Sequence, residues 1–145
     1  MPLKLSLKPG ERFVVNGAVM QNGDRRGVLL LQNKASVLRE KDIMQPTEVT
    51  TPARRIYFPV MMMYLDPSDV SSQYEEFVMR MTEFMSAIRN PEILKECVTC
   101  SKEVMSGEYY KALSRCRSIM TYEEECLGYV DQGVSADGEA DRESA

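Results

Sequence analysis

The chain contains no histidine in its 145 residues. This absence removes the most common general base and the most common zinc ligand of proteins, and every nucleophile that histidine would activate. The sequence also lacks a glycine-rich phosphate loop of the Gly-x-Gly-x-x-Gly or Gly-x-x-x-x-Gly-Lys type and a Gly-x-Ser-x-Gly nucleophile motif. We therefore expect a binding protein rather than an enzyme, with no cofactor and no catalytic residues.

Long hydrophobic runs are absent as well. No apolar run approaches the roughly 18 residues that a membrane-spanning helix requires, and the N-terminus is a lysine-containing amphipathic segment rather than a signal peptide. We expect a cytoplasmic protein without a membrane partner. The length and the 43% hydrophobic content suit about one globular domain.

The first 45 residues predict a small antiparallel β unit. Near the N-terminus leucine alternates with lysine or serine, which is the period of a strand with one buried face. Asn16-Gly17 separates two apolar segments and suits a type I′ hairpin, because both residues tolerate positive φ. Two more apolar segments follow, which gives five short strands. The expected strands cover residues 3–8, 13–15, 18–20, 25–31 and 35–39.

A β unit of this size cannot bury much surface by itself, and its outer strands expose unpaired backbone groups. It therefore needs a cover. We expect either that the downstream helices pack on it or that two copies pair their edges into a symmetric homodimer.

Residues 46–130 predict a mainly helical region packed on the β unit. Thr51-Pro52, Asp66-Pro67 and Asn90-Pro91 each place a capping side chain directly before a proline, a pattern that begins helices. The first of these segments contains Pro59 and can equally be extended. The second and third repeat apolar residues at helical spacing, with Val98 and Met105 expected to face inward, and a last helix should end at Gly128. The expected helices cover residues 51–65, 67–88, 91–106 and 108–127.

Residues 131–145 are small, polar or acidic and predict a disordered tail. The chain is therefore expected to be an α+β protein in three parts. Residues 1–45 form the β unit, residues 46–130 the helical bundle and residues 131–145 the tail.

Four cysteines admit a metal or redox site as an alternative. Cys97 and Cys100 form a Cys-x-x-Cys pair, and Cys116 and Cys126 follow it. The first pair lies within a predicted helix, and cysteine is a common small core residue. We therefore favour core packing and expect no metal site.

Positive charge is concentrated in the N-terminal part of the chain. Residues 1–60 carry ten Lys/Arg and five Asp/Glu, whereas residues 61–130 carry seven and twelve. Such a division predicts a polyanion-binding end and a different, acidic end. Phe13 is the only aromatic residue before position 57, so an aromatic stacking platform is not expected on the β unit.

Three segments give the chain a specific resemblance. PLKLSLKPGERFVVNGAV, QNGDRRGVLLLQNKASVLREKDIM and TPARRIYFPVMMMYLDP together resemble the flagellum biosynthesis repressor FlbT family over roughly residues 2–130. The resemblance implies a post-transcriptional regulator that associates with the 5′ untranslated region of flagellin mRNA and promotes its degradation. It also implies interplay with the flagellin regulator FlaF.

The N-terminal unit has a weaker similarity to the carbon storage regulator CsrA, a strand-exchanged dimer that binds GGA-containing leader RNA. Gly10-Glu11 matches its Gly-Glu, and Arg39 falls on the RNA-contacting arginine of its Val-His-Arg-Glu motif. Leu7-Lys8 stands where that family has consecutive arginines, and Leu38 replaces its histidine. We therefore do not carry over its GGA preference or its dimer geometry.

These observations predict an RNA-binding repressor whose β unit contacts the leader of flagellin mRNA. Arg39 is expected to lie closest to a base. The alternative is a protein-binding adaptor or chaperone for flagellar components, which acts through the acidic, methionine-rich helices without direct RNA contact. The expected phosphate contacts are Lys4, Lys8, Arg25, Arg26 and Lys34.

Overall fold

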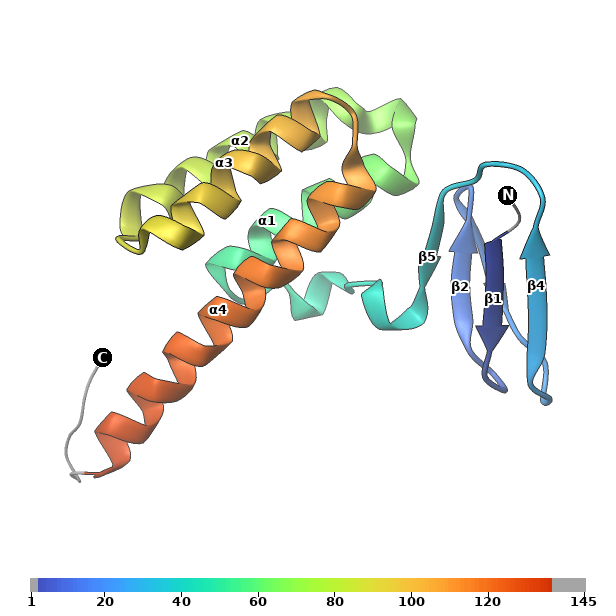
Figure 1. Cartoon of the computed structure of the whole chain (residues 1–145), viewed down its shortest axis with the longest axis horizontal. Coiled ribbons are helices and arrows are strands. Elements are labelled where there is room, and N and C mark those ends of the chain that lie inside the picture. Colours follow the sequence, from blue (N-terminus) through green and yellow to red (C-terminus); the bar gives the residue numbers. More distant parts are fainter. Residues whose placement is uncertain (1–2, 137–145) are drawn as a thin grey trace.

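The computed structural model describes residues 3–136 and has the predicted α+β architecture, with antiparallel strands followed by helices (Figure 1). Short 3₁₀ turns connect the two parts and lead into the second helix. The strands are β1 (Leu3–Leu7), β2 (Arg12–Val15), β3 (Ala18–Gln21), β4 (Gly27–Leu31) and β5 (Val37–Arg39). The helices are α1 (Pro52–Leu65), α2 (Val70–Ala87), α3 (Pro91–Met105) and α4 (Tyr109–Ala136).

The five strands form two small antiparallel sheets. One contains β1 and β4, with Leu3 opposite Leu31, and the other has the order β3-β2-β5. The predicted hairpin between β2 and β3 is confirmed, because Asn16 and Gly17 take φ values of 49° and 82°, as a type I′ turn requires. The sequence pattern therefore located all five strands.

The three-stranded sheet lies between the β1–β4 pair and the helices. On one face of it, the paired residues Val14 and Leu38 belong to the same buried cluster as the helical core. Strand alternation puts Phe13 and Val37 on the opposite face, and both are buried outside that cluster. Phe13 and Val37 therefore face β1, whose Leu5 and Leu7 are also buried.

Capping side chains begin two of the helices where the sequence predicted them. The Thr51 side chain accepts a hydrogen bond from the backbone N–H of Arg54, and the Asn90 side chain accepts from Glu92 and Ile93. Pro59 lies inside α1, so the segment that could have been extended is helical, and the buried proline ring is part of the core.

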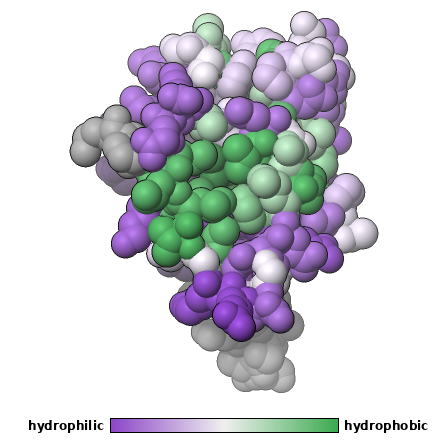
Figure 2. Space-filling view, turned by 90° about the vertical axis from the view of Figure 1, so that its right-hand side faces the viewer, coloured by the Kyte–Doolittle hydropathy of each residue, from purple (hydrophilic) through white to green (hydrophobic). Residues whose placement is uncertain are grey.

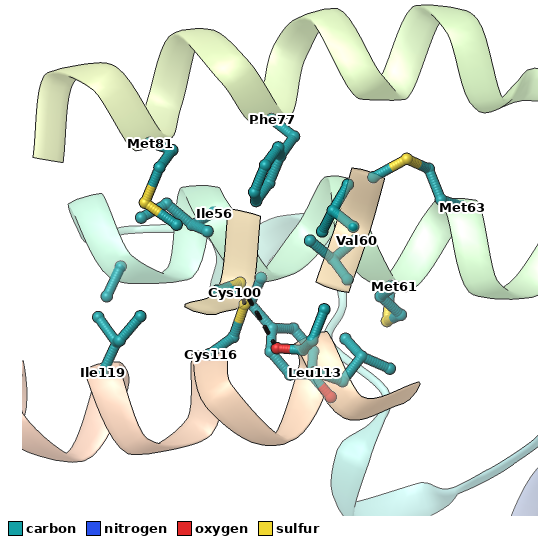
Figure 3. Packing of buried hydrophobic residues seen from close by; sticks show 14 of the residues in the cluster. Ile56, Val60, Met61, Met63, Phe77, Met81, Cys100, Leu113, Cys116 and Ile119 are labelled. Atoms are coloured by element: carbon teal, nitrogen blue, oxygen red, sulfur yellow. Dashed lines mark hydrogen bonds between the residues drawn. The ribbon is translucent and has the colours of Figure 1, made fainter. Parts of the chain in front are cut away.

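Helix α1 lies at the centre of the bundle and packs on both α2 and α4 (Figure 3). Its inward face contributes Ile56, Val60 and Met63, all almost fully buried, and Leu113 of α4 packs opposite them. The carboxylate of Glu123 on α4 accepts a hydrogen bond of 2.9 Å from the backbone N–H of Ala53. It thereby caps the first turn of α1 and joins the two helices.

Two predictions about the helices are wrong. Helix α4 continues through Gly128 to Ala136, past its predicted end and into the first six residues of the predicted tail. The rest of the predicted tail lies outside the described residues. A glycine inside a helix lowers the stability of the helix by only about 1 kcal/mol relative to alanine, so it need not end the helix. Gly107 differs, because it follows α3 with a φ of 78°, the conformation that ends a helix.

Val98 and Met105 of α3, predicted to face inward, are exposed. Helix α3 packs through a narrow stripe that contains Cys97, Cys100 and Val104, and this spacing leaves both residues outside it. No helix within residues 3–136 has the length and apolar content needed to cross a bilayer.

Candidate nucleic-acid-binding surface

All six predicted RNA-binding residues lie on the β unit, at different places. Lys4 is in the middle of β1 and Lys8 directly follows that strand. Arg25 and Arg26 precede β4, Lys34 lies between β4 and β5, and Arg39 ends β5. All are exposed except Arg39, which is partly buried. The structure therefore groups some of them and separates others.

Lys8, Arg25 and Arg26 lie together at one end of the β1–β4 pair. Leu7 is opposite Gly27 in the register, which places the residues just beyond these two side by side. The Asn22 side-chain amide donates to the backbone carbonyls of Lys8 at 2.8 Å and Arg25 at 2.9 Å. One amide group thus fixes both cation-bearing turns relative to each other.

Lys34 and Lys4 do not join this group. Leu31 pairs with Leu3, so Lys34 lies beyond the opposite end of the strand pair. Lys4 is opposite Leu30 in the middle of the outer face. The predicted set of phosphate contacts therefore does not form one continuous surface.

Arg39 is held within the protein by several bonds. Its Nη2 lies 2.9 Å from Glu11 Oε2, its Nε lies 3.1 Å from the same oxygen, and Nη2 also donates to the backbone carbonyl of Ser6. The guanidinium thereby links both sheets of the β unit. Its side chain remains 30% exposed, so one part of it faces solvent.

Glu11 is the anchor of this arrangement. The backbone N–H of Lys8 donates to its carboxylate at 2.9 Å and is the main reason that the pKa of Glu11 is lowered. Burial opposes this shift, and Arg39 adds to it. The ionised carboxylate therefore orients Arg39 and shapes the turn that bears Lys8.

Lys41 lies at the meeting point of three surface hollows. One, of about 580 Å³, includes Lys8, Gly10 and Arg39. A second, of about 440 Å³, extends between the β unit and the helices to Tyr110. The third, of about 400 Å³, is lined by acidic as well as basic side chains. Lys41 is exposed and connects the cationic end of the β unit with the cleft beside the helices.

That cleft contains an exposed aromatic ring beside an arginine. Tyr110 on α4 is 48% exposed, and the guanidinium carbon of Arg117 lies 5.9 Å from its ring centroid. Arg117 Nη1 lies 3.5 Å from the Asp42 carboxylate and is buried, with no hydrogen-bond partner among the described residues. The guanidinium lies over one face of the ring, and the exposed part of the ring that it leaves uncovered is suited to stack an unpaired base.

Tyrosines of α1 fix the backbone that lines the cleft. The Tyr64 hydroxyl accepts from the N–H of Val37 at 2.8 Å and donates to its carbonyl at 3.0 Å. The Tyr57 hydroxyl donates to the carbonyl of Asp42 at 2.6 Å, and burial raises the pKa of Tyr57 to about 12. Both phenols therefore stay neutral at physiological pH and tie the β unit to the bundle.

Sequence reasoning missed Tyr110 and Arg117. Both come from α4, far along the chain from the strands and outside the basic N-terminal part that predicted the site. Their spacing of seven is a usable signal, because it places the two side chains on one face of a helix, two turns apart.

Three of the four cysteines are core residues. Cys97, Cys100 and Cys116 are buried, and the sulfurs of Cys100 and Cys116 lie 3.7 Å apart without a disulfide. Burial raises the pKa of Cys97 to about 11, which favours an unreactive thiol. Among the described residues, no three His, Cys, Asp or Glu side chains are grouped as a metal site would need.

Comparison with known proteins places the chain among flagellar regulators. The family model described as flagellar protein FlbT matches residues 3–127. The flagellum biosynthesis repressor protein FlbT of Caulobacter vibrioides (strain ATCC 19089 / CIP 103742 / CB 15) is 68% identical over 140 residues, covering 97% of this chain and 99% of the relative. A probable FlbT repressor of Rhodopseudomonas palustris is 37% identical over 88% of this chain and 98% of its own length.

A probable FlbT repressor of Agrobacterium fabrum is 33% identical, over 86% of this chain and 83% of its own length. No solved structure matches the chain. The similarity of the N-terminal unit to CsrA therefore stays a prediction.

Proposed function

Because the chain belongs to the FlbT family of flagellar proteins, we propose that it represses flagellum biosynthesis by binding the 5′ untranslated region of flagellin mRNA in the cytoplasm. The protein acts by binding rather than by catalysis. The bound leader is not translated or is passed to a cellular nuclease, and the mRNA is lost.

The grouping of cations at one end of the β unit carries this proposal. Lys8, Arg25 and Arg26 are exposed and lie together, and Lys41 extends their charge toward the cleft. Such a group can neutralise several successive phosphates of a single strand. Arg39 contributes its exposed part at the centre of this surface.

The cleft beside the helices provides the proposed contact to a base. A base of the bound strand stacks on Tyr110, beside the Arg117 guanidinium, while neighbouring phosphates lie along Lys41 and Lys8. Stacking on one aromatic side chain contributes about 1–3 kcal/mol per base and tolerates different sequences. The proposed surface therefore spans both parts of the fold.

The test is binding of labelled flagellin leader RNA to the purified full-length protein over a series of salt concentrations. Affinity should fall steeply with salt, and Arg26→Ala should reduce the slope of log K against log salt by about one. Lys34→Ala is the matched control, because Lys34 is an equally exposed cation at the opposite end of the β unit. Lys34→Ala should change the slope of log K against log salt less than Arg26→Ala does.

Tyr110→Ala should weaken binding by about 1–3 kcal/mol while leaving the salt slope unchanged, because stacking releases no counterions. Arg39→Ala is expected to cost a similar amount, about 1–3 kcal/mol, and more than any single lysine change. Its melting temperature must be measured alongside, since the substitution also removes the partner of Glu11. A flat salt dependence of the wild-type protein would contradict direct RNA binding.

A second candidate function is a protein-binding adaptor for flagellar components, with FlaF as the expected partner. An apolar hollow of about 250 Å³ between α1, α2 and α4 favours it. Phe84, Ile88 and the exposed Leu127 are among its lining residues, on the more acidic part of the chain. Tight binding of FlaF or flagellin, combined with no RNA shift at low salt, would favour this function over the first.

A further inference from the structure

The sheet formed by β1 and β4 has aliphatic side chains on its outer face. Figure 2 looks onto this end of the molecule and shows hydrophobic side chains at the centre, with hydrophilic ones around them. Lys4 is opposite Leu30 in the register. Ser6 is opposite Val28, so all four side chains share the face that is opposite to the buried Leu5. Val28 and Leu30 therefore point away from the protein, and they are 56% and 57% exposed.

Packing within the chain does not explain these apolar residues. Strand β4 reads GVLLL, without the alternation expected of a strand that has one face in water, yet none of its residues is buried. The helices lie beyond the three-stranded sheet and do not reach the outer face (Figure 1). Within the described residues, Val28 and Leu30 thus remain without a cover.

The same sheet carries a concentrated positive charge. The two strands and their flanking residues, 3–8 and 25–34, contain five Lys/Arg and no Asp/Glu. Asp24 directly precedes the second segment, and the nearby Glu11 is already bound to Arg39. The five exposed cations are Lys4, Lys8, Arg25, Arg26 and Lys34. Such a face favours an anionic partner, and two copies of it would repel each other.

A surface hollow joins the charged and the apolar parts of this face. It has a volume of about 290 Å³, and its lining includes Ser6, Arg26 and Val28. A guanidinium and a hydroxyl can both donate hydrogen bonds to the oxygens of a phosphate. The valine beside them can contact a hydrocarbon chain attached to that phosphate. A phosphate joined to hydrocarbon is the chemistry of a phospholipid.

We propose that the outer face of β1 and β4 binds the surface of an anionic phospholipid membrane. Val28 and Leu30 enter the boundary between headgroups and acyl chains, and Arg26 binds a lipid phosphate in the adjoining hollow. Lys4 extends its stem along the apolar centre and its ammonium group toward the headgroups. Each cation near an anionic surface strengthens binding on the order of fivefold, so several together give a stable contact.

Other partners match this face less well. Neither β1 nor β4 contains an aromatic residue, so the face offers no ring on which a nucleic-acid base could stack. The side chains that contribute most to protein interfaces are Trp, Tyr and Arg, and they act at the centre of the contact. Here the centre is aliphatic and the cations surround it. This arrangement fits a lipid surface, with headgroups above hydrocarbon.

The inference is independent of the proposed RNA binding, because it follows from the strand register, burial and charge of the outer sheet. The expectation of no membrane partner came from the lack of a membrane-spanning segment, which does not bear on contact with a membrane surface. Arg25 and Arg26 belong to both proposed surfaces. An RNA strand and a membrane would therefore compete for these two side chains.

The experiment is cosedimentation of the full-length protein with vesicles of phosphatidylserine and phosphatidylcholine in equal amounts, without RNA. The protein should sediment with these vesicles at low salt but not with vesicles of phosphatidylcholine alone, and added salt should release it. The double variant Val28→Ser, Leu30→Ser should bind the mixed vesicles about tenfold or more weakly. Both residues are largely exposed, so the variant should keep the wild-type circular dichroism spectrum.

Met105→Ser is the matched control, since Met105 is 72% exposed but lies on α3 in the helical bundle. It should bind the vesicles as the wild type does. The double variant should keep the wild-type affinity for leader RNA, because neither Val28 nor Leu30 is a cation. Arg26→Ala should weaken binding to both. The vesicle and RNA measurements can thus fail separately.

Absence of sedimentation with the anionic vesicles at low salt would overturn the proposal. So would equal vesicle binding by the double variant and the wild type, because charge alone would then explain the adsorption. A lipid-free dimer that the double variant abolishes would assign this face to a second copy. Binding of soluble polyglutamate that requires Val28 and Leu30 would assign it to an acidic protein, and either result would contradict a membrane contact.

Discussion

Arg39 has one role that the structure shows and a second that we propose. The resemblance to CsrA singled it out as an RNA contact, and the structure shows the same guanidinium bound to Glu11 and to the carbonyl of Ser6. An arginine that is already oriented loses less side-chain entropy when it meets a ligand. The internal ion pair therefore positions the residue, while its exposed part can bind.

The Glu11 carboxylate should make stability depend on acid pH. Its pKa is lowered from the ordinary value of 4.5, so its ionisation stabilises the folded state above that value, and the contribution is lost as pH falls through the lower folded pKa. We expect the melting temperature of Glu11→Gln to fall less between neutral pH and pH values below 4.5 than that of the wild-type protein.

Glu75→Gln provides the comparison, since Glu75 is an exposed carboxylate on α2. Its melting curve should follow the wild type throughout. Parallel pH profiles for the wild type and Glu11→Gln would show that the ion pair contributes nothing to stability.

The cations of the site could be predicted from sequence, but their arrangement could not. A count of charges identifies the basic part of the chain, whereas Lys34 leaves the group only because of the strand register. Tyr110 and Arg117 enter the site because residues of α4 and β5 line the same cleft, a long-range arrangement that no local pattern reports. The sequence therefore predicted which residue types form the cationic part of the site, but only the fold shows how they are arranged.

At the scale of elements, the β2–β3 hairpin is the most constrained turn. Asn16 and Gly17 both have positive φ, and the Asn16 side chain accepts from the backbone N–H of Ser36 at 2.9 Å. A Cβ atom on Gly17 would lie 3.4 Å from the carbonyl oxygen of Leu65. The turn thus contacts the β5 side of the sheet and the end of α1.

Gly17→Ala should destabilise the protein by about 1–2 kcal/mol, because alanine is strained at a φ of 82°. Urea unfolding measures the change. Gly23→Ala is the control, since a Cβ atom added at Gly23 would have no neighbour within 4 Å and its φ is not in the left-handed region. Equal losses for both variants would argue against turn strain.

Local signals predicted the beginnings of elements better than their ends. Asn90-Pro91 and Asn16-Gly17 act through bonds and dihedral angles within a few residues, so their effect could be read directly. The end of α4 could not, because Gly128 stops a helix only if the chain turns there. The exposure of Met105 likewise depends on which neighbours α3 has.

At the scale of the whole molecule, one core joins the two parts of the chain. Val14 and Leu38 from the strands belong to the same buried cluster as Ile56 and Leu113 from the helices. The boundary predicted near residue 45 therefore separates two kinds of structure. We expect them to fold together rather than as independent units.

A urea titration followed by two probes should give one midpoint. Near-ultraviolet circular dichroism reports the tyrosines, all of which lie at or beyond Tyr57, and amide signals of β2 and β5 in nuclear magnetic resonance spectra report the β unit. Coincident transitions are expected from the shared core. An earlier midpoint for the strands would mean that the β unit unfolds separately.

The Asn22 side chain has a consequence for the kinetics of association. Because its amide holds the turns that bear Lys8 and Arg25 in the free protein, the loss of loop entropy occurs during folding and not on encounter with a ligand. A polyanion would meet a preorganised array of charges. Its capture would then be governed by diffusion and electrostatic steering rather than by slow loop rearrangement.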